Sequence, residues 1–297
     1  MYKSVAEYLR ELRRELAGSD PAIVQDALAD AEEHFSSAPG WGAMESENGN
    51  EGTSSLIESY GTPQEVAAAY REMEKRLPLP LTAFRRKESK SLWGKFFGVA
   101  ADIQTWSALL YMLFALVTGF IYGIWGLVGG AFSLMFSIFI IGIPMVGLFL
   151  LSIRILALME GRIVETLLGV RMPKKPIFLQ KGLSWSQKFK TLILESHTWK
   201  ALLYLILRLP QGIIYSVGTS ILLAFSIKFA LYPVWYFWLN RPLLRFRQPY
   251  FPPEGLIPLI SLIGILVFFL TLHLVRWLGR QQGRFAKFLL VRKEESV

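Results

Sequence analysis

Two stretches of the sequence repeat each other: residues 105–122 read TWSALLYMLFALVTGFIY, and residues 198–215 read TWKALLYLILRLPQGIIY. They are offset by 93 residues, and ten of their eighteen positions are identical. Both are almost entirely apolar, as expected of segments that cross a lipid bilayer. The sequence therefore predicts a membrane protein with an internal duplication.

The overall composition agrees with a membrane protein. Hydrophobic residues make up 53% of the 297 residues and charged residues only 19%, which is more apolar than an average soluble chain. Cysteine is absent, which excludes disulfides and thiolate chemistry. Residues 1–18 are charged and amphipathic rather than apolar, so we expect no secretory signal and a cytoplasmic N-terminus.

Charge divides the chain into an acidic head and a basic body. Residues 1–80 carry 7 Lys and Arg against 15 Asp and Glu, a balance of −8. Residues 81–297 carry 25 against 8, a balance of +17. The basic excess lies beside the apolar runs, which favours contact with anionic lipids over direct binding of nucleic acid.

Residues 1–80 are predicted to form a small acidic cytoplasmic helical bundle. The first helix spans 4–17, and the second starts at Pro21 after an Asp20 cap. A short helix ends at Gly61, and a capping box at 62–65 opens the last helix. The residues expected to face inward are Val5, Leu9, Leu12, Leu16, Val24, Leu28, Ala31, Phe35, Val66, Tyr70, Met73 and Leu77. With so few core residues the bundle is expected to dock on another surface. Its acidic face is a candidate docking surface or a merely solvated face.

Three strings in this head carry a family resemblance: YLRELRREL at 8–16, AEEHF at 31–35 and IESYGTPQEVAAAY at 57–70. Together they resemble the HAAS-type helical domain found beside bacterial signalling membrane proteins. The resemblance covers about residues 4–76 and implies no catalytic residues.

The rest of the chain is predicted to be a linker and a membrane domain. Residues 81–104 are basic and aromatic, which indicates an approach helix in the lipid headgroups, and a second approach helix around Trp185 and Phe189 precedes the second repeat. Spans are expected at about 107–128, 132–156, 201–231 and 256–278, with an outer turn at Gly129-Gly130. An alternative divides 201–238 into two short elements around Ala224.

The membrane domain, residues 105–291, is predicted to contain repeat 1 at 105–170 and repeat 2 at 198–291. Small residues recur at the offset of 93, and Arg154, Gly161 and Arg162 return 122 residues later as Arg276, Gly283 and Arg284. The difference between these two offsets fits an aromatic insertion at 233–258. This insertion is either an interfacial aromatic belt or a lipid-sensing surface. The predicted fold is all-α: a cytoplasmic bundle followed by about four spans built from two tandem helical hairpins.

Residues 140–173 carry a second resemblance, in the run IIGIPMVGLFLLSIRILALMEGRIVETLLGVRMP. It resembles the sensor domain of bacterial two-component systems, which reads G-x-P, an apolar run, then R-x-x-A-x-x-E-R-x-x-x-x-LLG. The matching residues are Gly142, Pro144, Arg154, Ala157, Glu160, Arg162, Leu167, Leu168 and Gly169, with Gly161 as one extra residue. The resemblance covers about 105–291 and implies a four-helix sensory module, usually joined to a histidine kinase. This chain has no kinase motif, so its output would pass through a partner.

Charged residues within or beside the apolar runs are the candidate functional residues. They are Arg154, Glu160, Arg162, Arg208, Lys228, His273, Arg276 and Arg284. Arg208 and Lys228 lie inside the third apolar run, where a charge is costly, although snorkelling would also explain them. His273 is a candidate proton sensor or a structural residue. Arg154, Glu160 and Arg162 are predicted to form an ion cluster in the inner leaflet, matched by Arg276 and Arg284. Alternatively, these residues anchor lipid headgroups.

No motif for a nucleophile, phosphate loop or metal site is present, so we expect no catalytic residue, cofactor or metal. Because basic loops favour the cytoplasmic side of a membrane, we expect a protein of the bacterial inner membrane with both termini in the cytoplasm. The first hypothesis is a non-enzymatic sensor or signalling adaptor. It would detect a lipid, a hydrophobic ligand or an envelope state and relay it through residues 1–80 to a transcription regulator or histidine kinase. The alternative is a small transporter or lipid-handling protein, which would need a homodimer to enclose a path.

Overall fold

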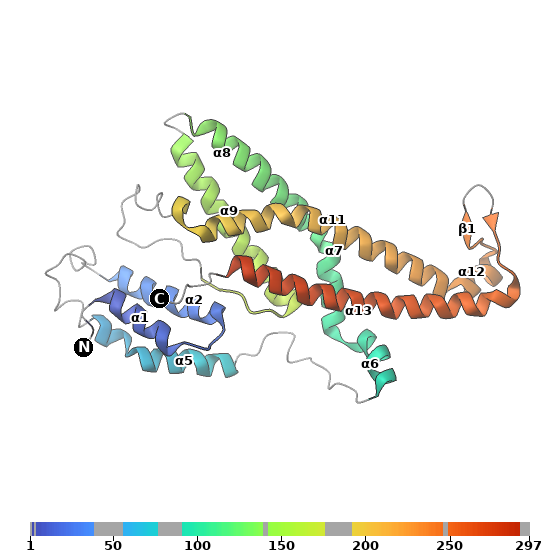
Figure 1. The fold of residues 1–297 in the computed structure, drawn as a ribbon, viewed down its shortest axis with the longest axis horizontal. Coiled ribbons are helices and arrows are strands. Elements are labelled where there is room, and N and C mark those ends of the chain that lie inside the picture. The colour runs from blue at the N-terminus through green and yellow to red at the C-terminus, as the bar shows by residue number, and fades with distance from the viewer. Residues whose placement is uncertain are drawn as a thin grey trace. The chain divides into compact units, whose positions relative to one another are not determined.

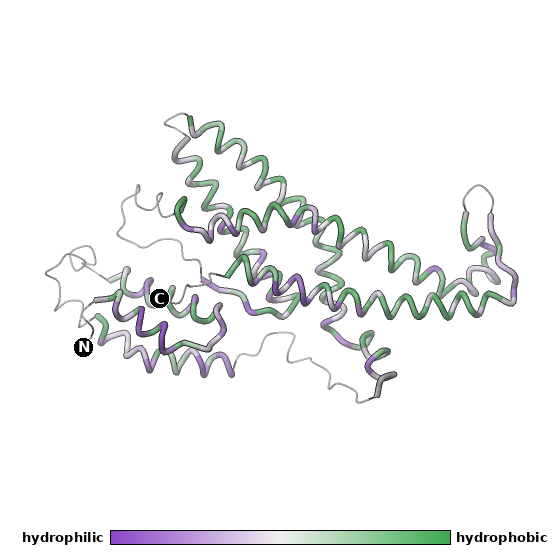
Figure 2. Tube along the Cα trace, in the orientation of Figure 1, coloured by the Kyte–Doolittle hydropathy of each residue, from purple (hydrophilic) through white to green (hydrophobic). Residues whose placement is uncertain are grey.

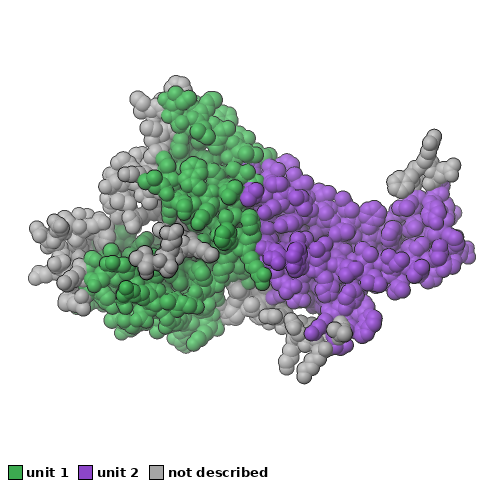
Figure 3. All heavy atoms as spheres, viewed as in Figure 1, with its two compact units in different colours: residues 1–83, 124–206, 284–297 green, residues 84–123, 207–283 purple. Residues whose placement is uncertain are grey.

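The computed structural model describes residues 2, 4–38, 56–76, 91–138, 142–175, 192–245 and 249–291, and it is built of α-helices (Figure 1). Two compact units are distinguished in Figure 3: residues 1–83, 124–206 and 284–297 form the first, and residues 84–123 and 207–283 form the second. The first unit groups the N-terminal bundle with part of the apolar helices. The predicted domain boundaries therefore stay predictions.

The N-terminal bundle consists of α1 (Val5–Glu15), α2 (Pro21–Ser37), a helical turn at 56–60 and α5 (Pro63–Arg76). The predicted start of α2 is confirmed, because the Asp20 carboxylate accepts the N–H of Ala22 at 3.0 Å and Pro21 is the first helical residue. The capping box of α5 is also confirmed. The Glu65 N–H donates to the Thr62 hydroxyl at 3.3 Å, and the Thr62 N–H donates to the Glu65 carboxylate at 2.9 Å.

The bundle core is centred on Tyr8, which is fully buried. Its hydroxyl donates to the carbonyl of Gly61 at 2.9 Å, and its ring packs edge-to-face on Phe35 and Tyr60. Burial raises the pKa of both phenols, that of Tyr60 to about 12, so both stay neutral at physiological pH. The buried members of this core are Tyr8, Leu12, Leu16, Ala27, Leu28, Ala31, Phe35, Ile57 and Ala67.

The predicted inward face of the last helix is only partly correct. Val66 and Tyr70 pack against the core, whereas Met73 is 48% exposed. The last residue of α5 in contact with the core cluster is Tyr70, so Met73 lies past the end of the apolar surface that would cover it. Leu77, Pro78 and Pro80 lie outside the described residues.

Among the residues that the structure describes, four helices are long and apolar enough to cross a membrane: Ile103–Phe136, Pro144–Leu168, Ser196–Ala230 and Glu254–Leu290. Their apolar character is visible along the chain in Figure 2. They comprise α7 (Ile103–Ile124), a π-helical turn (Trp125–Gly129), α8 (Gly130–Phe136), α9 (Gly142–Leu168), α11 (Ser196–Ala230), a 3₁₀ turn (Glu254–Leu256) and α13 (Ile257–Leu290). The predicted all-α fold with four candidate spans is confirmed.

The turn predicted at Gly129-Gly130 is wrong, because the helical backbone continues through both glycines to Phe136. A Cβ atom at Gly129 would lie 2.7 Å from the ring of Phe149 on α9. These glycines therefore allow α8 and α9 to approach closely, as small residues do between helices in lipid. The chain turns after Phe136 instead.

The alternative that divides 201–238 around Ala224 is also wrong. α11 runs unbroken to Ala230 with Pro210 inside it, and α12 (Tyr232–Leu239) follows. Pro233 is at the start of α12, where its missing N–H is tolerated but where it disfavours continuation of α11. A two-residue antiparallel ladder, β1 (Leu244–Arg245) and β2 (Pro249–Tyr250), lies within the predicted insertion.

The first predicted approach helix is present as α6 (Leu92–Gly98), followed by a 3₁₀ turn (Val99–Ala101). Trp93 is 74% exposed and stacks on Phe97, as suits a helix at a lipid interface. In the second predicted approach helix, Trp185 and Phe189 lie outside the described residues, whereas residues 192–194 are helical.

Glycines also bring helices together in the second unit. A Cβ atom at Gly119 of α7 would lie 2.6 Å from the carbonyl oxygen of Arg208 on α11. A Cβ atom at Gly212 of α11 would overlap the carbonyl oxygen of Ala115 on α7. The two glycines, which are equivalent in the predicted repeats, thus serve the same helix contact.

Replacing Gly212 by alanine should destabilise the protein, because the added methyl group meets rigid backbone. We expect a loss of about 1–3 kcal/mol, measured by thermal or denaturant unfolding in detergent micelles. Gly218→Ala is the matched control on the same helix, since its Cβ would meet nothing within 4 Å. Equal stabilities of the two variants would contradict the close contact of α7 and α11.

The Glu65 capping box should make the start of α5 sensitive to acid. Hydrogen bonds from Thr62 hold the pKa of the Glu65 carboxyl below its ordinary value of 4.5. This contribution is present above that ordinary pKa and is lost as the pH falls through the lowered one. Amide hydrogen exchange at Thr62 and at 64–67, corrected for intrinsic rates, should therefore accelerate at a pH below 4.5. Glu65→Gln, which can still cap, should lose this acceleration; an unchanged pH profile would argue against the prediction.

Candidate functional site

The most polar junction of the first unit follows directly after α9. This helix ends at Leu168, and Gly169 terminates it in the left-handed conformation, with φ +66°. Residues 170–175, which we call the strap, then run without helical structure against the N-terminal bundle.

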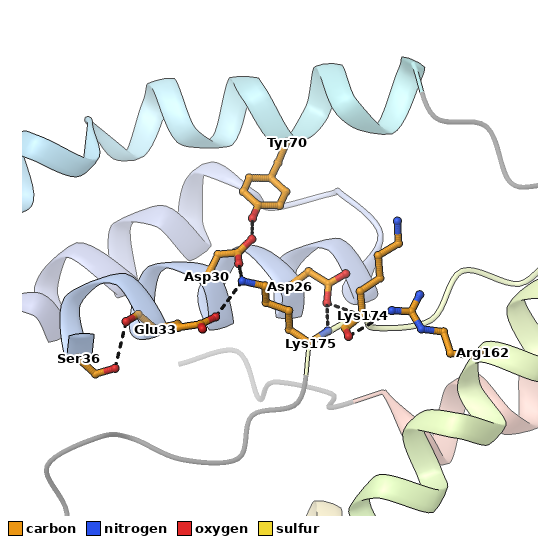
Figure 4. Close-up of polar contacts among 8 residues, drawn as sticks. All are labelled: Asp26, Asp30, Glu33, Ser36, Tyr70, Arg162, Lys174 and Lys175. Carbon is orange, nitrogen blue, oxygen red and sulfur yellow. Dashed lines mark hydrogen bonds and ion pairs between the residues drawn. The ribbon is translucent and has the colours of Figure 1, made fainter. Parts of the chain in front are cut away.

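The strap is held by three acidic residues of α2, as Figure 4 shows. The Asp26 carboxylate accepts the backbone N–H groups of Lys174 at 2.6 Å and Lys175 at 3.0 Å. The Lys175 ammonium pairs with Asp30 and, at 2.9 Å, with Glu33. Positions 26, 30 and 33 share one helix face, and we call these residues the acidic stripe.

The junction raises the pKa of one carboxyl group and of one ammonium group. Burial raises the pKa of the Asp26 carboxyl, while the N–H bonds from Lys175 and Lys174 act in the opposite direction. Hydrogen bonds to Asp30 and Glu33 raise the pKa of the Lys175 ammonium, so it is fully protonated at physiological pH. The Tyr70 hydroxyl donates to Asp30, which ties α5 to the same stripe.

Further ion pairs surround the strap. Arg171 pairs with Glu74 of α5 at 3.4 Å, and Arg162 of α9 donates to the carbonyl of Lys174 at 3.3 Å. A pocket of about 480 Å³ lies here, lined by charged groups of both signs from α2, α5, α9 and the strap. The junction thus joins the end of an apolar helix to the bundle by charge pairing.

The sequence reasoning missed this junction. The basic residues beside the apolar runs, which include Lys174 and Lys175, predict only topology and contact with anionic lipids, and the acidic stripe belongs to a face predicted to be either solvated or a docking surface. The available signal was the i, i+4, i+7 spacing of Asp26, Asp30 and Glu33 on a helix whose other face is apolar.

Arg154, Glu160 and Arg162, which are predicted to form an ion cluster, contact different partners among the described residues. Arg154 is buried and pairs with Glu195, and its Nε donates to Thr198 of α11 at 3.0 Å. Glu160 is fully buried and accepts from the Tyr204 hydroxyl at 3.1 Å. Arg162 pairs with Glu165 at 3.2 Å. Offsets of six and eight residues turn a side chain by about 240° and 80°, so the three occupy different helix faces.

In the second unit the candidate residues also find separate partners. Arg276 of α13 pairs with Asp102 at 2.9 Å. Arg208 is fully buried, with its guanidinium 4.5 Å from the centre of the Tyr111 ring. The Nε2 of His273 lies 3.1 Å from the carbonyl of Phe96, so His273 joins α13 to α6.

The two remaining candidates, Arg284 and Lys228, lie at partly or fully exposed positions. Arg284 is exposed and Lys228 is half-buried, and neither has an ion pair among the residues that the structure describes. Their positions agree with lipid-headgroup contact or snorkelling, which stays a prediction.

The two arginine pairs recur at the offsets of the predicted repeats. Arg154 and Arg276 are 122 residues apart, and their partners Glu195 and Asp102 are 93 apart. The indole of Trp106 donates to the carbonyl of Ala100 at 2.7 Å, and 93 residues later that of Trp199 donates to Ile193 at 2.7 Å. These recurrences support the duplication, which stays a prediction.

Comparison with known families agrees with this architecture. A family model described as "Putative sensor" matches residues 111–290. The chain belongs to this family. The HAAS model matches residues 7–69 of this sensor-family chain, so both resemblances seen in the sequence are confirmed. No curated protein and no solved structure shows significant similarity to it. Taken with the four apolar helices, these matches describe a membrane protein with a sensor domain and an N-terminal HAAS domain.

Neutralising Glu195 should be more harmful than removing its partner arginine. Glu195→Gln leaves the Arg154 guanidinium, which is 6% exposed, without its counter-charge, at a cost of about 3–5 kcal/mol. Arg154→Met removes the buried charge and leaves a partly exposed carboxylate, so it should cost less.

The comparison needs a surface pair as its reference. Glu11→Gln breaks an exposed pair with Arg14 and should change stability by about 1 kcal/mol or less. Unfolding in detergent measures all three variants. A Glu195→Gln protein as stable as Glu11→Gln would show that the Arg154 pair contributes little.

Proposed function

We propose that this sensor-family protein is a non-enzymatic signalling adaptor of a bacterial cytoplasmic membrane, with both termini in the cytoplasm. It would detect a lipid, a hydrophobic ligand or a state of the cell envelope. The N-terminal HAAS bundle would relay that state to a cytoplasmic transcription regulator or histidine kinase. The observation that carries the proposal is the docking of the strap, which continues from an apolar helix, on the acidic stripe.

Contacts within the first unit support a mechanical relay. Arg154 and Glu160 fix α9 to α11 through buried polar bonds, so α9 follows changes in its neighbour. Lys175 follows Gly169 by six positions, and a segment of that length spans at most about 20 Å. A shift of α9 that exceeds the slack of the strap must therefore pull on α2 or break the lysine contacts.

The pairing of the charges supports a role without catalysis. Among the described residues, Arg154 pairs with Glu195, Arg276 pairs with Asp102, and Glu160 accepts from the Tyr204 hydroxyl. This pairing offsets the cost of a charge in a membrane helix, so it needs no catalytic role to account for it. We therefore propose that the protein acts through changes in shape.

Removing the bundle should abolish partner capture without removing the protein from the membrane. We expect a variant lacking residues 1–80 to fractionate with membranes, and its crosslinked cytoplasmic partners in cells to fall at least about tenfold, because the relay surface is gone. Mass spectrometry of the crosslinked material measures the loss. Undiminished capture would contradict the relay. Solute or lipid flux in reconstituted liposomes above empty vesicles would favour a transporter.

A further inference from the structure

Two faces of helix α2 are covered, one by the apolar core of the bundle and the other by the charged strap. Leu28, Ala31 and Phe35 are buried in the bundle core. The acidic stripe is covered by the strap only in part, since Glu33 remains 63% exposed and Asp30 28% exposed. The stripe is therefore a charged surface that a short segment occupies without sealing it.

The contacts that the stripe makes are generic for an extended basic segment. Asp26 binds two consecutive backbone N–H groups, which any non-proline residues offer. Asp30 and Glu33 bind one ammonium group, which any lysine offers. No feature of these contacts is peculiar to the strap, so a partner with a similar segment would fit.

The strap contacts its own helix through a buried side chain and the stripe through a partly exposed one. Met172 is fully buried, and it lies beside Gly161 of α9, where an added Cβ would be 3.5 Å from the Met172 side chain. The Lys175 side chain, in contrast, is 42% exposed. Exposed ion pairs contribute little net free energy and are weakened by salt, so the lysine end of the strap can exchange while Met172 stays bound.

We propose that the acidic stripe is the partner-binding surface of the HAAS bundle and that the strap is its intramolecular competitor. The partner presents an extended segment rich in lysine or arginine, which complements a head of balance −8. This inference rests on the proposed relay. In that relay, α9 draws the strap away from the acidic stripe, and the partner then binds the stripe. The stripe is masked in the state described here.

The test uses the full chain in lipid nanodiscs and a fluorescent peptide of the strap sequence VRMPKKP, residues 170–176. Fluorescence polarisation measures its binding. Lys175→Ala weakens the internal competitor, so the peptide should bind about tenfold more tightly than to the unchanged chain. Adding Asp30→Asn and Glu33→Gln to Lys175→Ala should abolish that binding.

A matched control separates the stripe from general charge attraction. Glu11→Gln with Glu72→Gln, in the Lys175→Ala background, removes the same charge from α1 and α5. This control should keep the tight binding. Should it lose affinity as much as the stripe variant, the peptide is held by net charge and the inference fails.

A charge exchange guards against a stripe variant that simply misfolds. Asp30→Lys with Glu33→Lys, in the Lys175→Ala background, reverses the charge of the stripe, so the chain should lose the strap peptide and should bind instead a variant of that peptide in which both lysines are glutamate. Equal binding by the unchanged chain and by Lys175→Ala overturns the masking. Partner capture in cells that needs residues 1–80 but survives neutralisation of the stripe also overturns this inference, while the relay itself would stand.

Discussion

A lipid bilayer offers no hydrogen-bond partner to a polar group, and this constraint organises the apolar part of the chain. Arg154, Glu160 and Arg208 lie on long apolar helices and are buried, so each must be satisfied by protein. Their partners come from other helices or from the segments that precede them. Because burial makes these pairs costly to break singly, they fix which helices neighbour one another within each unit.

Features that depend on local sequence could be predicted. The apolar runs gave four long helices, and the Asp20 cap and the capping box of Thr62 and Glu65 were found where their spacing placed them. Gly129-Gly130 could not be interpreted locally, because glycines serve turns and close helix contacts equally well. The ring of Phe149, twenty residues further along, decides between the two. Similarly, no residue near Met73 in the sequence indicates that the bundle core ends before this position.

The candidate site shows a different limit. Arg154 and Arg276 are predicted site residues because they lie beside apolar runs, whereas Glu195 and Asp102, which precede the two apolar repeats, are not among the predicted site residues. Their common offset of 93 residues was nevertheless present in the sequence. Following the repeat through its polar residues as well as its apolar ones would have identified both pairs. Asp26 and Lys174, in contrast, are separated by 148 residues with no repeat to connect them, so only the fold brings them together.

The two kinds of ion pair on α9 and its strap suit opposite tasks. The Arg154–Glu195 pair is 6% and 16% exposed, so it is poorly screened and holds α9 to α11 as one body. The Lys175–Glu33 pair is 42% and 63% exposed, so water and salt compete with it. A displacement that loads both contacts therefore separates the exposed pair first. In the proposed relay, a movement of α9 with α11 would therefore release the charged surface of α2, because the buried contact is harder to break than the exposed one.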